Sequence, residues 1–116
     1  MASKKVIGDK GEEEACHYLI ANGYHILERN WRFGRAEIDI IGQLEEELVF
    51  IEVKTRKNNM FGYPETFLSE SQQERIHLAA EHFIKERDWK GRNRFDIISI
   101  IMDPQKPELE HFEDAF

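Results

Sequence analysis

The stretch AEIDIIGQLEEELVFIEVKT, residues 36–55, predicts a β-hairpin. Two runs rich in isoleucine, valine and leucine flank a short acidic segment, and polar and apolar side chains alternate within parts of both runs. A turn centred between Glu45 and Glu46 would fix which residues pair across the hairpin. This register decides which side chains share a face of the sheet.

That register places Asp39 opposite Glu52, and Glu37 opposite Lys54. Directly opposed residues of an antiparallel pair share one face, with Cβ atoms about 5 Å apart. A slip of one residue would separate the two carboxylates, because it moves every side chain of one strand to the other face. The opposite face is aliphatic, and we expect these side chains in the core: Ile38, Ile40, Ile51 and Val53.

The two facing carboxylates predict a metal site. Carboxylates held together in partly buried strands repel, so one is protonated unless a cation lies between them. Oxygen ligands at a partly open site suit Mg²⁺ or Mn²⁺ better than zinc, which favours cysteine and histidine. Lys54, on the same face, would orient or help deprotonate a water that attacks phosphorus, or stabilise the charge that develops there.

A helix predicted over residues 9–22 adds another carboxylate. Apolar and small side chains recur there at helical spacing, and Gly23 stands where a C-terminal cap is expected. Among three consecutive glutamates, Glu12 alone lies on the apolar stripe that faces the sheet. A carboxylate that points inward needs a partner or a metal ion.

Plainer interpretations of these residues stay open on spacing alone. Glu52 and Lys54 also fit a charge pattern on a solvent-exposed strand face. Asp39 also fits a strand-end residue that caps a backbone group, and Glu12 a charge that complements the dipole of the first helical turn.

The whole chain predicts an α/β protein, with one mixed sheet flanked by helices in the order helix, three strands, helix, strand. We expect strands over 24–33, 36–42, 48–55 and 95–102, a loop over 57–66, and a second helix from Ser69 to the turn at 89–93. The tail, LEHFEDAF, either adds an edge strand or docks loosely. The 116 residues fit a single domain, 1–116, with a core at about 8–101 and a tail at 103–116.

The composition restricts the function. The net charge of −7 argues against binding nucleic acid by bulk electrostatics, so such a function needs a local basic surface or a metal ion. The single cysteine, Cys16, cannot form an internal disulfide and is expected as a small buried side chain. No apolar run approaches the ~20 residues of a membrane span, and no signal peptide is recognisable, so a cytoplasmic protein without a membrane partner is expected.

The spacing of Asp39 and the Glu52-Val53-Lys54 triplet, thirteen positions later, resembles the PD-(D/E)xK nuclease superfamily, which has the restriction-endonuclease-like fold. Four motifs in order resemble the YraN family of bacterial proteins, which is similar to archaeal Holliday junction resolvases. These motifs are GDKGEEEA at 8–15, GRAEIDIIG at 34–42, FIEVKTR at 50–56 and RFDIISI at 94–100. The resemblance covers residues 8–101.

The resemblance implies roles for single residues. Asp39 and Glu52 would be catalytic metal ligands for Mg²⁺ or Mn²⁺, and the backbone carbonyl of Val53 would complete the coordination. Lys54 would be the catalytic lysine, and Glu12 the acidic residue of the first helix, which acts in catalysis and at the metal.

Other family positions are less decided. Glu37 and Asp96 fall in family segments, where a structural role is equally open. The family usually has a basic residue at the start of the second helix, before a glutamine. This chain has Gln72-Gln73 there, and we expect Gln73 to approach the site.

The expected partner is DNA. Basic side chains lead into and out of the hairpin, and we expect them to contact nucleic acid: Arg29, Arg32, Arg35, Arg56 and Lys57. A second basic group ends the second helix: Lys85, Arg87, Lys90, Arg92 and Arg94. Trp31 and Phe33 either stack on unpaired bases or join the core. Nothing encodes base readout, so a structure-selective endonuclease linked to repair or recombination is expected.

Two other functions compete with this one. The first is a non-catalytic nucleic-acid-binding module with a nuclease fold, and the second is a purely structural or protein-interaction domain. Related resolvases act as dimers on symmetric junctions, so a homodimer is a possible form of this protein.

Overall fold

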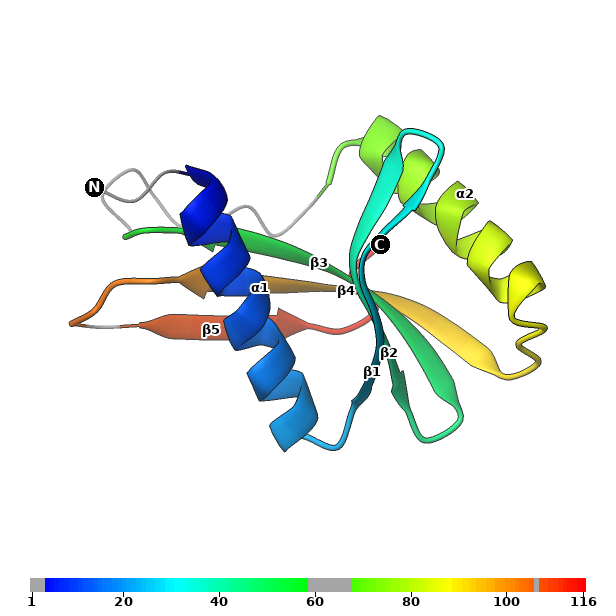
Figure 1. Ribbon diagram of the computed structural model, residues 1–116, viewed down its shortest axis with the longest axis horizontal. Helices are drawn as coiled ribbons and strands as arrows, with labels where there is room; N and C mark the ends of the chain where they lie inside the picture. The colour runs from blue at the N-terminus through cyan, green and yellow to red at the C-terminus, as the bar shows by residue number, and fades with distance from the viewer. Residues whose placement is uncertain (1–3, 59–67, 106) are drawn as a thin grey trace.

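The computed structural model describes residues 4–58, 68–105 and 107–116 (Figure 1). These residues form two helices and five strands: α1 (Lys4–Ala21), β1 (His25–Phe33), β2 (Ala36–Leu44), β3 (Glu47–Arg56), α2 (Glu70–Glu86), β4 (Arg92–Ile101) and β5 (Glu108–Phe112). The strands form one mixed sheet in the order β1-β2-β3-β4-β5. β3 and β4 run parallel, and the other neighbouring pairs run antiparallel. α2 makes the crossover that a parallel pair requires.

The predicted order of helix, three strands, helix and strand is confirmed, and the arrangement is consistent with a restriction-endonuclease-like fold. The tail adds an edge strand rather than docking loosely, because β5 pairs antiparallel with β4. The predicted loop at 57–66 lies, from residue 59 onward, outside the described residues. Neither helix in the described part of the chain is long and apolar enough to cross a membrane.

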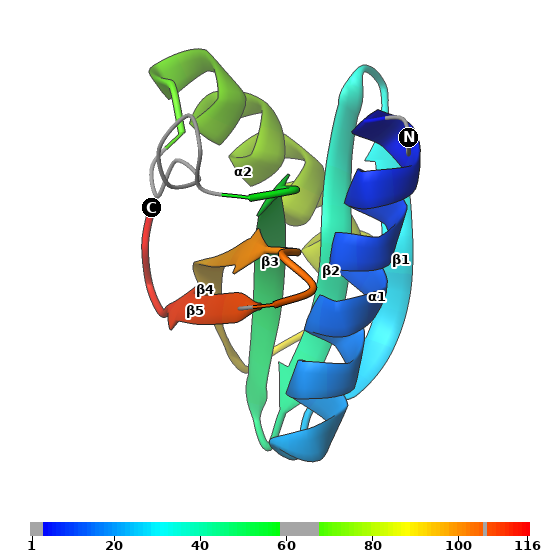
Figure 2. The same ribbon diagram turned by 90° about the vertical axis from the view of Figure 1, so that its left-hand side faces the viewer.

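The two helices cover opposite faces of the sheet (Figures 1 and 2). β3 shows this most clearly, because Val49 and Ile51 pack in the core beneath α1, whereas Leu48 and Phe50 pack in the core beneath α2. A strand covered on both faces must be apolar at consecutive positions, which explains the run from Leu48 to Ile51. Cys16 is buried in the α1 core, as predicted.

The strands of the predicted hairpin pair in the predicted register and then separate. Their ladder runs from the pair Leu44 and Glu47 to the pair Ile40 and Ile51. Further along, β2 stays paired with β1, and β3 stays paired with β4. The sheet therefore opens into a fork between β2 and β3, which starts at Asp39.

The fork corrects one prediction about the core. Ile40, Ile51 and Val53 pack together beneath α1, but Ile38 belongs to the core beneath α2. The prediction that Ile38 shares a face with Ile40 is therefore wrong. Side chains alternate regularly only where a strand is evenly paired, and the alternation along β2 breaks at Asp39, where β3 leaves it.

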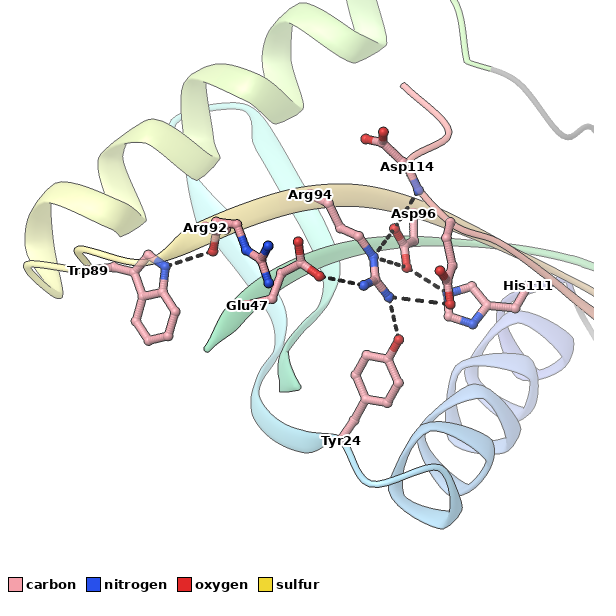
Figure 3. A network of polar contacts seen from close by, with 9 residues as sticks. Tyr24, Glu47, Trp89, Arg92, Arg94, Asp96, His111 and Asp114 are labelled. Carbon is pink, nitrogen blue, oxygen red and sulfur yellow. Dashed lines mark hydrogen bonds and ion pairs between the residues drawn. The ribbon is translucent and has the colours of Figure 1, made fainter. Parts of the chain in front are cut away.

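A polar network joins β5 to β4 and α1 (Figure 3). Asp96 of β4 is fully buried. It accepts hydrogen bonds from Arg94 Nε at 3.0 Å and from the Asp114 N–H at 2.9 Å, and it lies 2.7 Å from His111 Nε2. The other ring nitrogen of His111 lies 3.0 Å from the Tyr18 hydroxyl.

This network decides the role of Asp96. Burial alone would raise the pKa of its carboxyl, but the hydrogen bonds from His111 and Arg94 outweigh burial and lower that pKa. Asp96 is therefore an ionised structural residue, and it lies outside the acidic group at the fork.

Candidate active site

Asp39 bridges the fork with its side chain. Its Oδ2 accepts a hydrogen bond from the Val53 N–H at 2.8 Å, directly beyond the point where the β2–β3 ladder ends. The carboxyl of Asp39 also lies close enough to the carboxyl of Glu52 for each group to shift the pKa of the other. The structure thus brings together the two carboxylates that the hairpin register places opposite each other.

Both of these carboxyl groups have raised pKa values. Burial, followed by the neighbouring charge of Glu52, raises the pKa of Asp39 to about 8, although the Val53 N–H favours the ionised form. Burial also raises the pKa of Glu52, against the hydrogen bond with Asp39 and the positive charge of Lys54. In the absence of a cation, the pair therefore retains a proton at neutral pH.

α1 brings a third carboxyl group to the fork. Burial and the charge of Asp39 raise the pKa of Glu12 to about 7. The preceding residue, Gly11, makes this approach possible, since a Cβ atom there would lie 2.1 Å from Oγ1 of Thr55 on β3. The glycine of the GEEE segment thus lets α1 lie directly on β3 and aim Glu12 at Asp39.

Glu37 completes the acidic group. Oxygens of Glu12, Glu37 and Asp39 all lie within 4.8 Å of one another. Glu37 pairs with Arg32 across the β1–β2 ladder, and its Oε2 lies 2.9 Å from Nη2 of Arg32. The fork separates it from Lys54, its predicted neighbour on β3.

Asn30 is a residue that sequence reasoning missed. It lies within β1, yet its φ of 51° is in the left-handed region, which asparagine tolerates better than most residues. With its amide in the orientation that satisfies both partners, its nitrogen lies 3.0 Å from Glu37 Oε1 and 3.1 Å from Glu12 Oε2. Asn30 therefore holds two carboxylates of the acidic group in place. The only signal in the sequence is an asparagine in the middle of a strand-like run.

Lys54 lies on β3, two residues after Glu52, and its charge lowers the pKa of Glu52. The described residues provide no ion-pair partner for Lys54. Its ammonium group is therefore available to an anionic substrate beside the carboxylate pair.

A pocket of about 150 Å³ opens beside the fork, between β2 and α2. It is lined by Arg35, Ala36, Glu37, Glu52, Gln72, Arg75 and Ile76. Of the two glutamines at the start of α2, Gln72 borders the pocket. Gln73 donates a hydrogen bond to the Leu68 carbonyl at 2.9 Å and is not among the lining residues, so its contact with a substrate stays a prediction.

The basic side chains expected at the substrate surface lie around the fork in different ways. Arg29 is close enough to Glu12 for its charge to lower the pKa of that carboxyl, and Arg32 is paired with Glu37. Arg35 borders the pocket. Arg56 ends β3, and Lys57 follows it as an exposed residue.

The second basic group lies away from the fork. In the β3–β4 ladder, Arg92 lies beside Glu47, at the opposite end of β3 from Lys54. Most of the group is occupied by carboxylates of the same chain: Lys85 by Glu81, Arg87 by Glu28, Lys90 by Asp88, and Arg94 by Glu47 and Asp96. These pairs do not favour a second phosphate-binding surface.

The two aromatic residues of β1 pack within the molecule. Trp31 contacts the Phe83 ring edge-on, with a centroid separation of 5.3 Å. Phe33 stacks on His82 at 4.0 Å. These contacts favour the core interpretation of Trp31, whereas Phe33 stays partly exposed at 36%.

Comparison with known proteins gives one consistent result. The model of the family described as "Uncharacterised protein family UPF0102" matches residues 11–100. A UPF0102 protein of Phocaeicola vulgatus is 40% identical over 116 residues, which cover 100% of this chain and 96% of the relative. A UPF0102 protein of Rhodococcus opacus is 41% identical over 120 residues, which cover 100% of both chains. The UPF0102 protein of Geobacter metallireducens is 41% identical over 113 residues, which cover 97% of this chain and 93% of the relative.

Proposed function

The chain belongs to the UPF0102 family, the YraN group that its motifs resemble, and from the acidic fork we propose that it is a Mg²⁺- or Mn²⁺-dependent phosphodiesterase acting on DNA. The observation that carries this proposal is the pair of Asp39 and Glu52, two half-buried carboxyl groups that lie together where the β2–β3 ladder ends, each with a raised pKa. Such a pair destabilises the protein when both groups are ionised, and a divalent cation between them removes the repulsion. A metal site gives this arrangement a physical reason that a surface charge pattern does not.

The donor atoms fit a hard cation. The acidic group consists of carboxylates, and no histidine or cysteine joins it among the described residues. Oxygen ligands of this kind suit Mg²⁺ and Mn²⁺. We propose that Asp39 and Glu52 hold the ion together with the backbone carbonyl of Val53, and that Glu12 contributes from α1.

A metal ion in this position would polarise a phosphoryl oxygen and lower the pKa of a bound water. The residues of the chain supply the remaining chemistry. The ammonium group of Lys54 either holds the attacking water or stabilises charge that develops on the phosphate. Glu12, from α1, would hold or accept a proton beside the metal ligands.

DNA is the proposed substrate because basic side chains surround the fork of an otherwise acidic protein. Contacts from arginine and lysine to phosphate carry no sequence information, which favours an endonuclease that recognises DNA structure in repair or recombination. The proposal includes a cytoplasmic location, and a homodimer on substrates that offer two symmetric strands.

The experiment is a cleavage assay with Mg²⁺ and with Mn²⁺ on single-stranded, linear duplex, flapped and four-way-junction DNA. Wild type is compared with Asp39→Asn, Lys54→Ala and the control Lys85→Ala, which removes a positive charge far from the fork. We expect cleavage by wild type and Lys85→Ala, and at least a hundredfold loss in the two fork variants, each of which should remain folded at the assay temperature.

Equal cleavage by wild type and Asp39→Asn would contradict the proposal. DNA binding that persists in EDTA, without cleavage in either metal, would instead support the non-catalytic binding module.

A further inference from the structure

Two arginines from different elements line the pocket beside the fork. Arg35 lies in the turn between β1 and β2, directly after Gly34, whose φ of 61° directs the chain into that turn. Arg75 lies on α2, in the helical turn after Gln72. Both arginines are exposed, and both line the same pocket as Glu52 and Ile76.

Within residues 4–58, 68–105 and 107–116, neither arginine has an ion-pair partner. The ion pairs formed by the described residues involve neither Arg35 nor Arg75, although the carboxylates of Glu37 and Glu52 line the same pocket. Glu37 is occupied by Arg32 instead. The chain has 23 acidic residues for 16 basic ones, so two arginines without a carboxylate partner have all their donors left for an anion from outside.

Gln72 does not compete for this role. Its side-chain oxygen accepts hydrogen bonds from the backbone N–H and the hydroxyl of Ser69, which fixes it in the cap of α2. Among the described residues that line the pocket from α2, Arg75 is therefore the one with N–H donors for a substrate anion.

We propose that Arg35 and Arg75 form a phosphate clamp, which holds a phosphodiester group of the substrate strand over Glu52. A guanidinium presents paired N–H donors that match two phosphate oxygens, a geometry that lysine lacks. The carboxylates of the pocket repel a phosphate, and the clamp offsets this repulsion. The clamp rests on the proposed function, and it places the DNA backbone between the β1–β2 turn and α2.

The test measures DNA binding separately from cleavage. A fluorescently labelled four-way junction and a labelled single strand are titrated with protein in EDTA and in Ca²⁺, over a range of salt concentrations. The variants are Arg35→Ala, Arg75→Ala and Arg75→Lys. Arg92→Ala is the matched control, because it removes the same charge from an exposed position at the other end of the sheet.

We expect Arg35→Ala and Arg75→Ala each to bind about tenfold more weakly and to lower the salt slope of log Kd by about one. Arg75→Lys should recover part of the affinity, Arg92→Ala should match wild type, and all variants should melt at the same temperature. If wild type binds and cleaves DNA but Arg75→Ala binds it as tightly as Arg92→Ala does, the clamp is wrong and the proposed function still stands. A wild type that neither binds nor cleaves DNA would contradict the proposed function, and the clamp with it.

Discussion

Asp39 has two opposing effects on the stability of the fold. Its side chain satisfies the Val53 N–H at a point where β2 no longer reaches β3. The same carboxyl lies against Glu52, and its pKa is raised to about 8. The hydrogen bond needs only an acceptor oxygen, whereas the repulsion needs a negative charge. An asparagine at position 39 would therefore keep the hydrogen bond and remove the repulsion.

Asp39→Asn should therefore make the metal-free protein more stable at alkaline pH. A carboxyl whose folded pKa is raised stabilises the fold fully below about pH 4, its ordinary unfolded pKa, and this contribution is lost as pH rises through about 8. Urea unfolding in EDTA should show wild type losing stability between pH 5 and 9, by roughly 1–3 kcal/mol more than the variant. Parallel pH profiles for the two proteins would contradict the shared proton. Mg²⁺ should stabilise wild type more than the variant.

The carboxylates at the fork also show which site residues can be predicted from sequence spacing and which cannot. Asp39, Glu52 and Glu12 follow from spacing, because strand pairing and helical periodicity are local rules. Asn30 does not, because its left-handed backbone and its two carboxylate partners arise only when α1, β1 and β2 pack together. Arg75 is likewise brought to the pocket by the packing of α2 against β2, which no spacing in the sequence specifies.

At the level of elements, Gly11 sets how closely α1 lies on β3. A methyl group at this position would lie 2.1 Å from Thr55 Oγ1 and 2.7 Å from its Cγ2, so the helix or the strand would have to move. Alanine has the higher helix propensity by about 1 kcal/mol, which means that packing and propensity act in opposite directions here.

Gly11→Ala should destabilise the protein by about 1–2 kcal/mol and weaken Mg²⁺ binding, because the shift of α1 moves Glu12 away from Asp39. Gly8→Ala is the matched control on the same helix, since nothing lies within 4 Å of a Cβ atom there. It should stabilise the protein by about 0.5–1 kcal/mol. The checks are urea unfolding and calorimetric titration with Mg²⁺. Two alanine variants of equal stability and equal metal affinity would show that the close approach at Gly11 has no effect.

The spacing of apolar residues predicted which helices and strands form better than it predicted where they begin and which face each side chain occupies. The hairpin register is confirmed, because it depends on a short turn between two apolar runs. α1 begins at Lys4, earlier than the predicted residue 9, since Val6 and Ile7 stand alone among polar residues and glycines there and form no apolar repeat. The face of Ile38 was predicted wrongly, because regular alternation assumes a continuous ladder and the sheet forks at that point.

At the level of the whole molecule, Asp96 connects the sheet to its last strand. It is buried beside Arg94 and His111, and its pKa is lowered by their hydrogen bonds against the opposing effect of burial. A carboxyl with a depressed folded pKa stabilises the fold above its unfolded pKa of about 4, and this contribution is lost as pH falls through the lower folded value.

Asp96→Asn should therefore cost about 2–4 kcal/mol at pH 7, because it removes a fully buried carboxylate that pairs with both Arg94 and His111, while Arg94 keeps Glu47 at 2.7 Å and Glu113 at 3.7 Å. The difference from wild type should shrink as pH falls below about 4, where wild type also loses the charge. Urea unfolding at a series of pH values measures both effects, with Asp103→Asn as a control that changes a carboxylate beyond β4. Equal stability of Asp96→Asn and wild type at pH 7 would contradict the structural role.

The contact between Tyr18 and His111 joins residues that are 93 positions apart. Closing so long a loop carries a large entropic cost, so contacts of this kind tend to form after local ones such as the β2–β3 hairpin. During synthesis, α1 and Asp96 leave the ribosome before the histidine that completes their network. We therefore expect the growing chain to keep Asp96 hydrated until β5 is made, and we expect β5 to dock late in folding.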